Sequence, residues 1–264
     1  MAGLLPNIDP DGLLEYSVVY TDRSLNHMSN SFQKAMNDVS SSLKKVYSAE
    51  SVVLVPGGGT YGMEAVARQF ATNADCLVIR NGWFSYRWSQ ILEMGNIPSK
   101  LTVLKASRKN SGPQEPFSPV EIDKIVAKIK SEKPKIVFAP HVETSAGIIL
   151  PDDYIKAVSE AVHSVGGLFV LDCIASGAIW VDMKKCGVDV LISAPQKGWS
   201  ASPAFGMVMM SSNATKKIQN TQSSSFSCDL LKWHQIMQAY EAGGHAYHAT
   251  MPTDAIKHFR DTIN

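Results

Sequence analysis

Seven short runs rich in Val, Ile and Leu, separated by longer amphipathic stretches, constrain the fold of this 264-residue chain more than any other feature. Continuous apolar runs are typical of strands whose two faces are both buried, as in a parallel sheet, and the intervening stretches have the periodicity of helices. The sequence therefore predicts an α/β fold, a mainly parallel seven-stranded sheet with helices on both faces. The expected strands are 51–55, 76–79, 100–104, 135–139, 167–171, 188–192 and 206–210.

The amphipathic stretches predict six helices, two of which begin at recognisable signals. Ser118 precedes a proline and Glu121 in the pattern of an N-cap with a capping box, which predicts a helix from residue 119. Pro151 and the two acids after it open another helix. The first 30 residues are weakly periodic and are expected to form an N-terminal arm over the domain or over a partner subunit. The expected helices are 32–47, 62–71, 84–94, 119–131, 152–164 and 229–240.

Composition limits the partners of the chain. The net charge is +1 and the lysines are scattered, which argues against a nucleic-acid track or an anionic membrane surface. No apolar run reaches the roughly 18 residues of a membrane helix, and the first residues lack the features of a signal peptide. The four cysteines are widely spaced, so neither a zinc site nor a disulfide framework is indicated. We expect a cytoplasmic protein whose partners are small molecules or other subunits.

Lys197 and Asp172 each follow an apolar run, and they are the strongest candidates for chemistry. The carboxyl ends of parallel strands meet at one edge of a sheet, so an amine and an acid there can face one ligand from two sides. Pyridoxal 5'-phosphate (PLP) enzymes need such a pair, because the lysine forms a Schiff base and the acid keeps the pyridine nitrogen protonated. The plainer interpretation is a solvated surface lysine and an aspartate that caps a helix.

A glycine-rich segment at 56–62 follows the first strand and opens a helix. Its free N–H groups and the positive end of the helix dipole predict an anion site. Gly57, Gly59 and Gly62 also fit the G-x-G-x-x-G pattern of NAD-binding folds, but the second strand ends in Arg80 instead of the acid expected for a ribose hydroxyl. An arginine there suits an NADP phosphate, and a tight turn that needs small residues is a third interpretation.

Four aromatic residues lie within 83–88, after the second strand. Helix core packing is the default explanation for such a cluster. Because the cluster lies at the same sheet edge as the glycine loop, one ring can instead stack on a planar cofactor, and Phe84 is the candidate. The segment 141–147 adds hydroxyls and an acid at this edge. A lone histidine such as His141 is usually structural, and only its company here makes it a candidate.

Seven segments together resemble the class V aminotransferases of PLP fold type I, and most closely the alanine–glyoxylate and serine–pyruvate aminotransferase group. They occur in the order of the family and span nearly the whole chain. The segments are NHMS at 26–29, GGGTYGMEA at 57–65, NGWF at 81–84, HVETSAG at 141–147, LDCIASG at 171–177, SAPQKG at 193–198 and AYHATMP at 246–252.

The resemblance implies a role for each matching residue. Lys197 is expected to form the Schiff base and to move a proton between the substrate α-carbon and the cofactor, and Asp172 to pair with the pyridine nitrogen. Phe84 takes the place of the stacking aromatic, where relatives often carry tryptophan, and Thr144 that of the hydroxyl near the phenolic oxygen of the ring. The phosphate ligands are expected to be Gly58, Gly59, Thr60 and Gln196.

The resemblance also implies a homodimer with shared active sites, because Tyr247 and Thr250 match residues that reach the phosphate in the neighbouring subunit. It divides the chain into an arm at 1–30, a PLP-binding large domain at 31–250, and the start of a helix at 251–264. Family members continue into a small C-terminal domain that carries the arginine for the substrate carboxylate. We expect this chain to lack that domain, because Arg80, Arg87 and Arg260 do not match its arginine.

The expected activity is therefore transfer of an amino group from a small amino acid, alanine or serine, to a small 2-oxo acid, glyoxylate or pyruvate. One alternative is a truncated PLP-binding protein with weak or no catalysis. A lyase or desulfurase on the same scaffold is a second, although such relatives place histidine where this chain has Gln196. An NAD(P) dehydrogenase is the third and least favoured.

Overall fold

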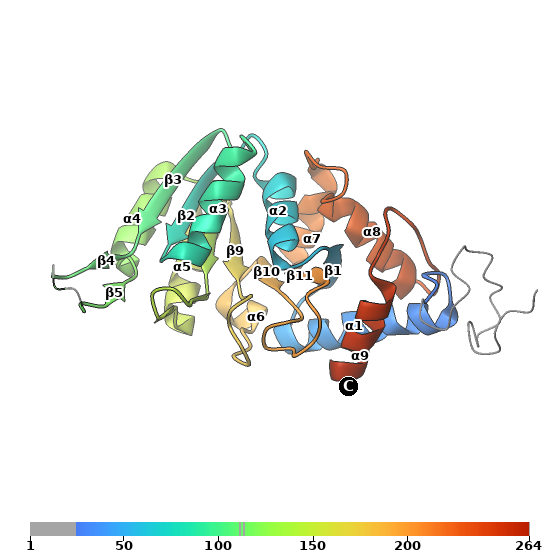
Figure 1. Cartoon of the computed structure of the whole chain (residues 1–264). Coiled ribbons are helices and arrows are strands. Elements are labelled where there is room, and N and C mark those ends of the chain that lie inside the picture. The colour runs from blue at the N-terminus through green and yellow to red at the C-terminus, as the bar shows by residue number, and fades with distance from the viewer. Residues whose placement is uncertain (1–24, 111, 113, 264) are drawn as a thin grey trace, which may run out of the picture.

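The computed structural model of the chain describes residues 25–110, 112 and 114–263, and a seven-stranded sheet forms its centre (Figure 1). The strand order is β1-β11-β10-β9-β6-β2-β3. Only β11 runs antiparallel to its neighbours β1 and β10, so the prediction of a mainly parallel sheet is confirmed. The strands are β1 Ser51–Pro56, β2 Asp75–Arg80, β3 Lys100–Lys105, β6 Ile136–Pro140, β9 Leu168–Asp172, β10 Val190–Ser193 and β11 Phe205–Met210.

Each of the seven predicted strands is present, with ends shifted by at most two residues. The apolar runs were informative because every residue of β6, β9, β10 and β11 is buried. Strand β3, at one edge of the sheet, has no fully buried residue and correspondingly contains polar as well as apolar side chains. Burial of both faces therefore explains the uniform composition of the central strands.

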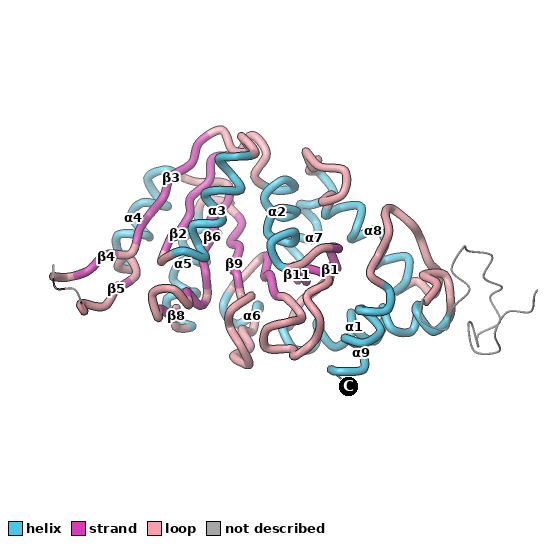
Figure 2. The backbone as a smooth tube through the Cα atoms, viewed as in Figure 1, coloured by secondary structure: helices cyan, strands magenta, loops and turns pink. Residues whose placement is uncertain are grey.

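Helices cover both faces of this sheet (Figures 1 and 2). Helices α2 and α3 pack on each other and on the sheet, α4 and α5 pair with each other, and α1 contacts β1, α8 and α9. The helices are α1 Asn30–Tyr47, α2 Gly59–Phe70, α3 Trp83–Met94, α4 Ile122–Glu132, α5 Asp152–Ser164, α6 Met183–Cys186, α7 Ser212–Lys217, α8 Leu230–Glu241 and α9 Thr253–Ile263.

The predicted start of the helix at 119 is wrong. Helix α4 begins at Ile122 with Glu121 as its N-cap, and Ser118 instead belongs to a hairpin formed by β4 (Ser107–Arg108) and β5 (Phe117–Ser118). Ser118 pairs with Ser107 across this hairpin, so its backbone is extended by tertiary pairing and cannot open the helix. The pairing of Ser118 in the hairpin therefore overrides its local capping pattern.

The last helix, α9, lies against α1 (Figure 1). Its Phe259 is fully buried, with ring centroids 5.5 Å from Phe205 and 5.8 Å from Trp199, and Arg260 forms an ion pair of 3.3 Å with Asp38 of α1. Residues 253–263 are thus packed on the body of the molecule. Of the predicted arm at 1–30, residues 1–24 lie outside the described residues, and the division at 30 and 250 stays a prediction.

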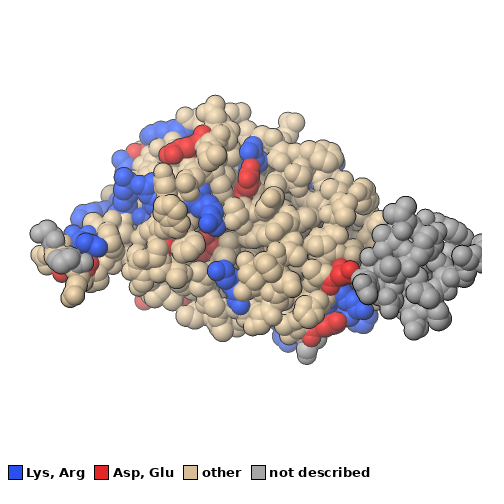
Figure 3. All heavy atoms as spheres, viewed as in Figure 1, with Lys and Arg blue, Asp and Glu red and all other residues tan. Residues whose placement is uncertain are grey.

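On the face drawn in Figure 3, basic side chains are interspersed with acidic ones among a majority of uncharged atoms.

All four cysteines are buried free thiols. None of the described helices combines the length and the hydropathy that a membrane crossing requires.

Candidate active site

A cavity of about 170 Å³ lies at the carboxyl edge of the sheet, and it collects most of the predicted site residues. The strands β1, β9 and β10 all end there, because the one reversed strand, β11, leaves β1 pointing the same way as β10. Seven of the ten predicted residues line this cavity, namely Gly59, Thr60, Phe84, Thr144, Asp172, Gln196 and Lys197. The structure thus brings these seven residues together at one place.

Asp172, the last residue of β9, is a buried acid in the wall of this cavity, with 7% of its surface exposed. Its Oδ1 accepts the backbone N–H of Ile174 at 2.9 Å. Burial raises the pKa of Asp172 to about 6, although this hydrogen bond and the charges of Arg87 and Lys197 act in the opposite direction. A carboxylate in this position is stabilised by a cationic ligand group placed beside it.

Lys197 lies in the loop between β10 and β11 and contributes to the cavity from the carboxyl end of β10, the neighbour of β9. Backbone hydrogen bonds within the loop include those from Lys197 N to Ala194 O at 3.4 Å, from Ser200 N to Lys197 O at 3.3 Å and from Ala201 N to Pro195 O at 3.0 Å. The side chain is exposed, and its Nζ forms no ion pair with any residue between 25 and 263 that the structure describes. An amine without a carboxylate partner is available to a ligand.

The glycine loop forms a third side of the cavity. Gly58 is the N-cap of α2 with φ 150°, a backbone conformation that favours glycine, and it has no side chain to cap the helix. The first N–H groups of α2 therefore lack a side-chain partner from the cap and are free for an anion. A Cβ on Gly59 would lie 2.7 Å from Ile174 Cδ1, so only glycine fits here without movement of the cavity wall.

Helix α3 supplies two side chains, of which the sequence identified one. Phe84 and Arg87 are three positions apart and so lie on one helix face. Arg87 Nη1 donates to Thr60 Oγ1 at 3.1 Å, and its guanidinium carbon is 5.9 Å from the centroid of the Phe84 ring. The one-turn spacing after Phe84 was the signal that could have found Arg87. The default interpretation holds for Trp88, which is buried and packs at 4.5 Å on Phe138.

The segment 141–147 is divided between the cavity and the core. Thr144 and Val142 line the cavity, whereas His141 is buried with its Nδ1 2.7 Å from Ser176 Oγ. Burial lowers the pKa of His141. His141 is thus a neutral structural residue, while the acid of the segment, Glu143, is buried behind the cavity wall.

Tyr247 and Thr250 are not brought to this cavity within one chain. Their hydroxyl oxygens are 3.3 Å apart, and both residues line a different cavity of about 400 Å³ together with His27, Met28 and Trp233. Tyr247 is 64% exposed. Within one chain, these two residues therefore lie outside the lining of the Lys197 cavity.

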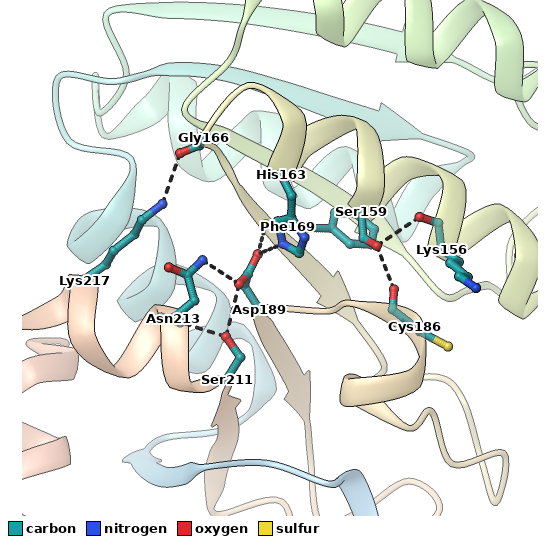
Figure 4. A network of polar contacts seen from close by, with 11 residues as sticks. Lys156, Ser159, His163, Gly166, Phe169, Cys186, Asp189, Ser211, Asn213 and Lys217 are labelled. Carbon is teal, nitrogen blue, oxygen red and sulfur yellow. Dashed lines mark hydrogen bonds and ion pairs between the residues drawn. The ribbon is translucent and has the colours of Figure 1, made fainter.

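A third cavity, of about 530 Å³, lies at the amino edge of the sheet, and its buried acid is hydrogen-bonded within the fold. Asp189 is buried there and accepts four hydrogen bonds of 2.7–3.1 Å (Figure 4). Burial alone would raise its pKa, but the bonds from His163, Phe169 and Asn213 lower it overall. The donors are His163 Nε2, Phe169 N, Ser211 Oγ and Asn213 Nδ2.

Comparisons with known proteins agree with this geometry. The family described as Aminotransferase class-V matches residues 13–263. Alanine–glyoxylate aminotransferase 1 of Saccharomyces cerevisiae is 27% identical over 237 residues, which are 85% of this chain and 58% of that protein. The 2-aminoethylphosphonate–pyruvate transaminase of Vibrio vulnificus is 29% identical over 216 residues, 80% of this chain and 54% of that protein. A solved alanine–glyoxylate aminotransferase from Nostoc sp. has TM-score 0.76 and 24% identity, covering 90% of this chain and 60% of that one. The chain spans just over half the length of these curated relatives.

Proposed function

Because the chain belongs to the class V aminotransferase family, we propose that it binds PLP in the cavity between Asp172 and Lys197 and catalyses transamination. The fold is that of PLP fold type I enzymes, as the sequence predicted. The proposed amino donor is a small amino acid, alanine or serine. The proposed acceptor is a small 2-oxo acid, glyoxylate or pyruvate, in line with the names of the yeast and Vibrio relatives.

One observation carries the proposal: a buried acid, an unpaired amine and a helix N-terminus share one cavity. The residues fit PLP by their chemistry. Asp172 suits the protonated pyridine nitrogen, the ring of Phe84 suits a flat aromatic ring, and the hydroxyl of Thr144 suits a phenolic oxygen. The phosphate would be held by the first turn of α2 and the loop before Lys197, through Gly58, Gly59, Thr60 and Gln196.

When bound, PLP supplies an electron sink for the carbanion that forms when the substrate α-carbon loses its proton. Lys197 Nζ is the base that holds this proton and returns it, since it is the amine of the cavity that no described carboxylate neutralises. Beside a cationic pyridine nitrogen, Asp172 would stay ionised and would keep the ring electron-poor. The side chains of Phe84 and Ile174 give the cavity apolar walls, which exclude water from the α-carbon.

The proposal includes a homodimer with shared sites. Tyr247 and Thr250 are exposed or nearly so, carry hydroxyls on a common surface, and lie away from the Lys197 cavity of their own chain. Hydroxyls from a second subunit would add donors to the phosphate, and cofactor binding would then stabilise the dimer. Sedimentation of the protein with and without PLP tests this arrangement, and a monomer at saturating PLP would contradict it.

A second candidate function, PLP binding without turnover, is favoured by the arginine content of the cavity. Among the described lining residues Arg87 is the only arginine, and it already bonds to Thr60. A substrate carboxylate usually requires a bidentate arginine of its own. Addition of alanine separates the candidates, because only an aminotransferase converts bound PLP to its amine form.

The decisive experiment is an absorption spectrum of the purified protein with PLP, alone and after alanine. We expect a violet band from lysine-bound PLP that disappears on addition of alanine. Lys197→Ala should abolish this band, whereas Lys184→Ala, an exposed lysine at the amino edge of the sheet, should retain it. A band that survives Lys197→Ala would refute the assignment of the site.

A further inference from the structure

Glu143 is a fully buried carboxylate directly behind the cavity wall, and the proposed mechanism gives it no role. It ends the two-residue strand β7 (Val142–Glu143), which pairs with β8 (Ile148–Ile149). Its Oε2 accepts Ser85 N at 2.9 Å and Ser85 Oγ at 2.6 Å, and its Oε1 accepts Phe84 N at 3.1 Å and Ser145 Oγ at 2.6 Å. Burial would raise the pKa of Glu143, but these bonds lower it overall, so the side chain is charged.

These bonds replace the cap that α3 lacks. The N-cap residue is Gly82, which has no side chain, and the carboxylate that satisfies the first N–H groups comes from a segment about 60 residues further along the chain. Such a charge is favourable at the positive end of a helix. A Cβ on Gly82 would lie 2.7 Å from Glu143 Cγ and would also meet Ser145 Oγ, so the glycine provides the space for this acid.

The remaining N–H groups of the turn are also bonded to side chains. Ser85 Oγ accepts Asn81 N at 2.8 Å and Gly82 N at 3.1 Å, and Ser145 Oγ accepts Trp83 N at 2.8 Å. Five consecutive N–H groups, from 81 to 85, therefore end on Glu143 or on a serine bonded to it. These hydrogen bonds tie the position of the first turn of α3 to that of Glu143.

Glu143 thereby connects two walls of the cavity without touching the cavity. Phe84, whose N–H it accepts, lines the cavity from α3, and Thr144, its neighbour in the chain, lines it from the turn after β7. Arg87 follows Phe84 by one turn on the same helix. A shift of Glu143 would displace both walls together.

We propose that Glu143 is a positioning residue, which acts through Phe84 to set the orientation of the PLP ring; this rests on the proposed function. The alternative is an ordinary buried cap that stabilises the fold and leaves the ring unaffected. Asp189 offers the comparison, since it is equally buried and accepts four bonds, but at the opposite edge of the sheet (Figure 4).

The test compares Glu143→Gln with Asp189→Asn. Glutamine keeps the size of the side chain, but one carboxylate oxygen becomes an NH₂ group, which cannot accept a hydrogen bond. The N–H and O–H groups that donate to that oxygen therefore lose their acceptor. We expect circular dichroism in the violet PLP band, per bound cofactor, to fall by about half, and the dissociation constant of PLP to rise about tenfold. Asp189→Asn should lower the melting temperature about as much as Glu143→Gln does, but it should leave the dichroism and the dissociation constant of PLP unchanged.

A double variant tests the path of the effect. In a Phe84→Leu background, Glu143→Gln should change the dissociation constant of PLP by less than about twofold, because the ring through which it acts is gone. A full tenfold effect in that background would overturn the proposal, since Glu143 would then act by another path. If Glu143→Gln does not fold, Ser145→Ala removes the acceptor of Trp83 N and one donor to Glu143 Oε1, and we expect the dissociation constant of PLP to rise about threefold.

The outcomes separate this inference from the proposed function. If wild-type protein shows a violet band that depends on Lys197, and Glu143→Gln or Ser145→Ala binds PLP with wild-type dichroism and affinity, then only the role of Glu143 is refuted. If wild-type protein shows no such band, the proposed function fails and the inference fails with it.

Discussion

Replacing Asp172 by asparagine should stabilise the protein in the absence of PLP, while it removes the acid that we propose as the partner of the pyridine nitrogen. The reason is that burial raises the pKa of Asp172 from its ordinary value of 3.8 to about 6. Above pH 3.8 the unfolded chain releases this proton while the folded chain retains it until about pH 6, so the stability of the folded protein falls as the pH rises through this interval. Asparagine is neutral throughout and can still accept the Ile174 N–H.

The size of the effect follows from the two pKa values. The raised pKa of Asp172 should lower the free energy of unfolding of the wild-type protein by about 3 kcal/mol at pH 7. The loss should be about half of that at pH 5 and less than about 1 kcal/mol at pH 4. Urea unfolding of the PLP-free proteins at these three pH values measures it, since other titrating groups cancel in the difference between wild type and variant. An Asp172→Asn protein that is no more stable than wild type at pH 7 would refute the claim that the cavity penalises this charge.

The same experiment has a control of opposite sign. Asp189 is also buried, but its hydrogen bonds lower its pKa overall, so its charged form stabilises the fold. Asp189→Asn should therefore lower the free energy of unfolding at pH 7, and this loss should diminish as the pH falls through the lowered pKa. The two buried aspartates are expected to respond oppositely because Asp189 accepts four hydrogen bonds, whereas the one bond from Ile174 N to Asp172 does not offset burial.

Two further predictions concern the cavity and the amino edge. Phe84→Ala should raise the dissociation constant of PLP about tenfold through loss of ring stacking, whereas Phe84→Tyr should bind PLP about as tightly as wild type. Fluorescence titration measures these constants, and equal constants for all three proteins would contradict the prediction. The bond to Asp189 raises the pKa of His163 above 6.5, although burial opposes it, so its contribution to stability is full below pH 6.5 and is lost as the pH rises through the raised pKa. His163→Ala should accordingly destabilise the protein more at pH 6 than at pH 9 in thermal melts, and an equal loss at both values would contradict this linkage.

The apolar runs of the sequence predicted all seven strands of the sheet, since a strand buried on both faces has to be apolar throughout. They could not predict that β11 is reversed, because the direction of a strand depends on its connections and on the neighbours that it finds. The start of α4 shows the same limit. Ser118 has the local pattern of a cap, and pairing with Ser107 decides otherwise.

By itself, the sequence determined the strands of the sheet and most of the helices. It also placed Asp172 and Lys197 after apolar runs, and the carboxyl ends of parallel strands meet at one edge of a sheet. Only the tertiary structure decided that Arg87 shares the cavity and that Glu143 caps α3. These depend on contacts between segments far apart in the chain. Periodicity and capping patterns reach only a few residues, so they carry no information about which distant carboxylate meets which helix end.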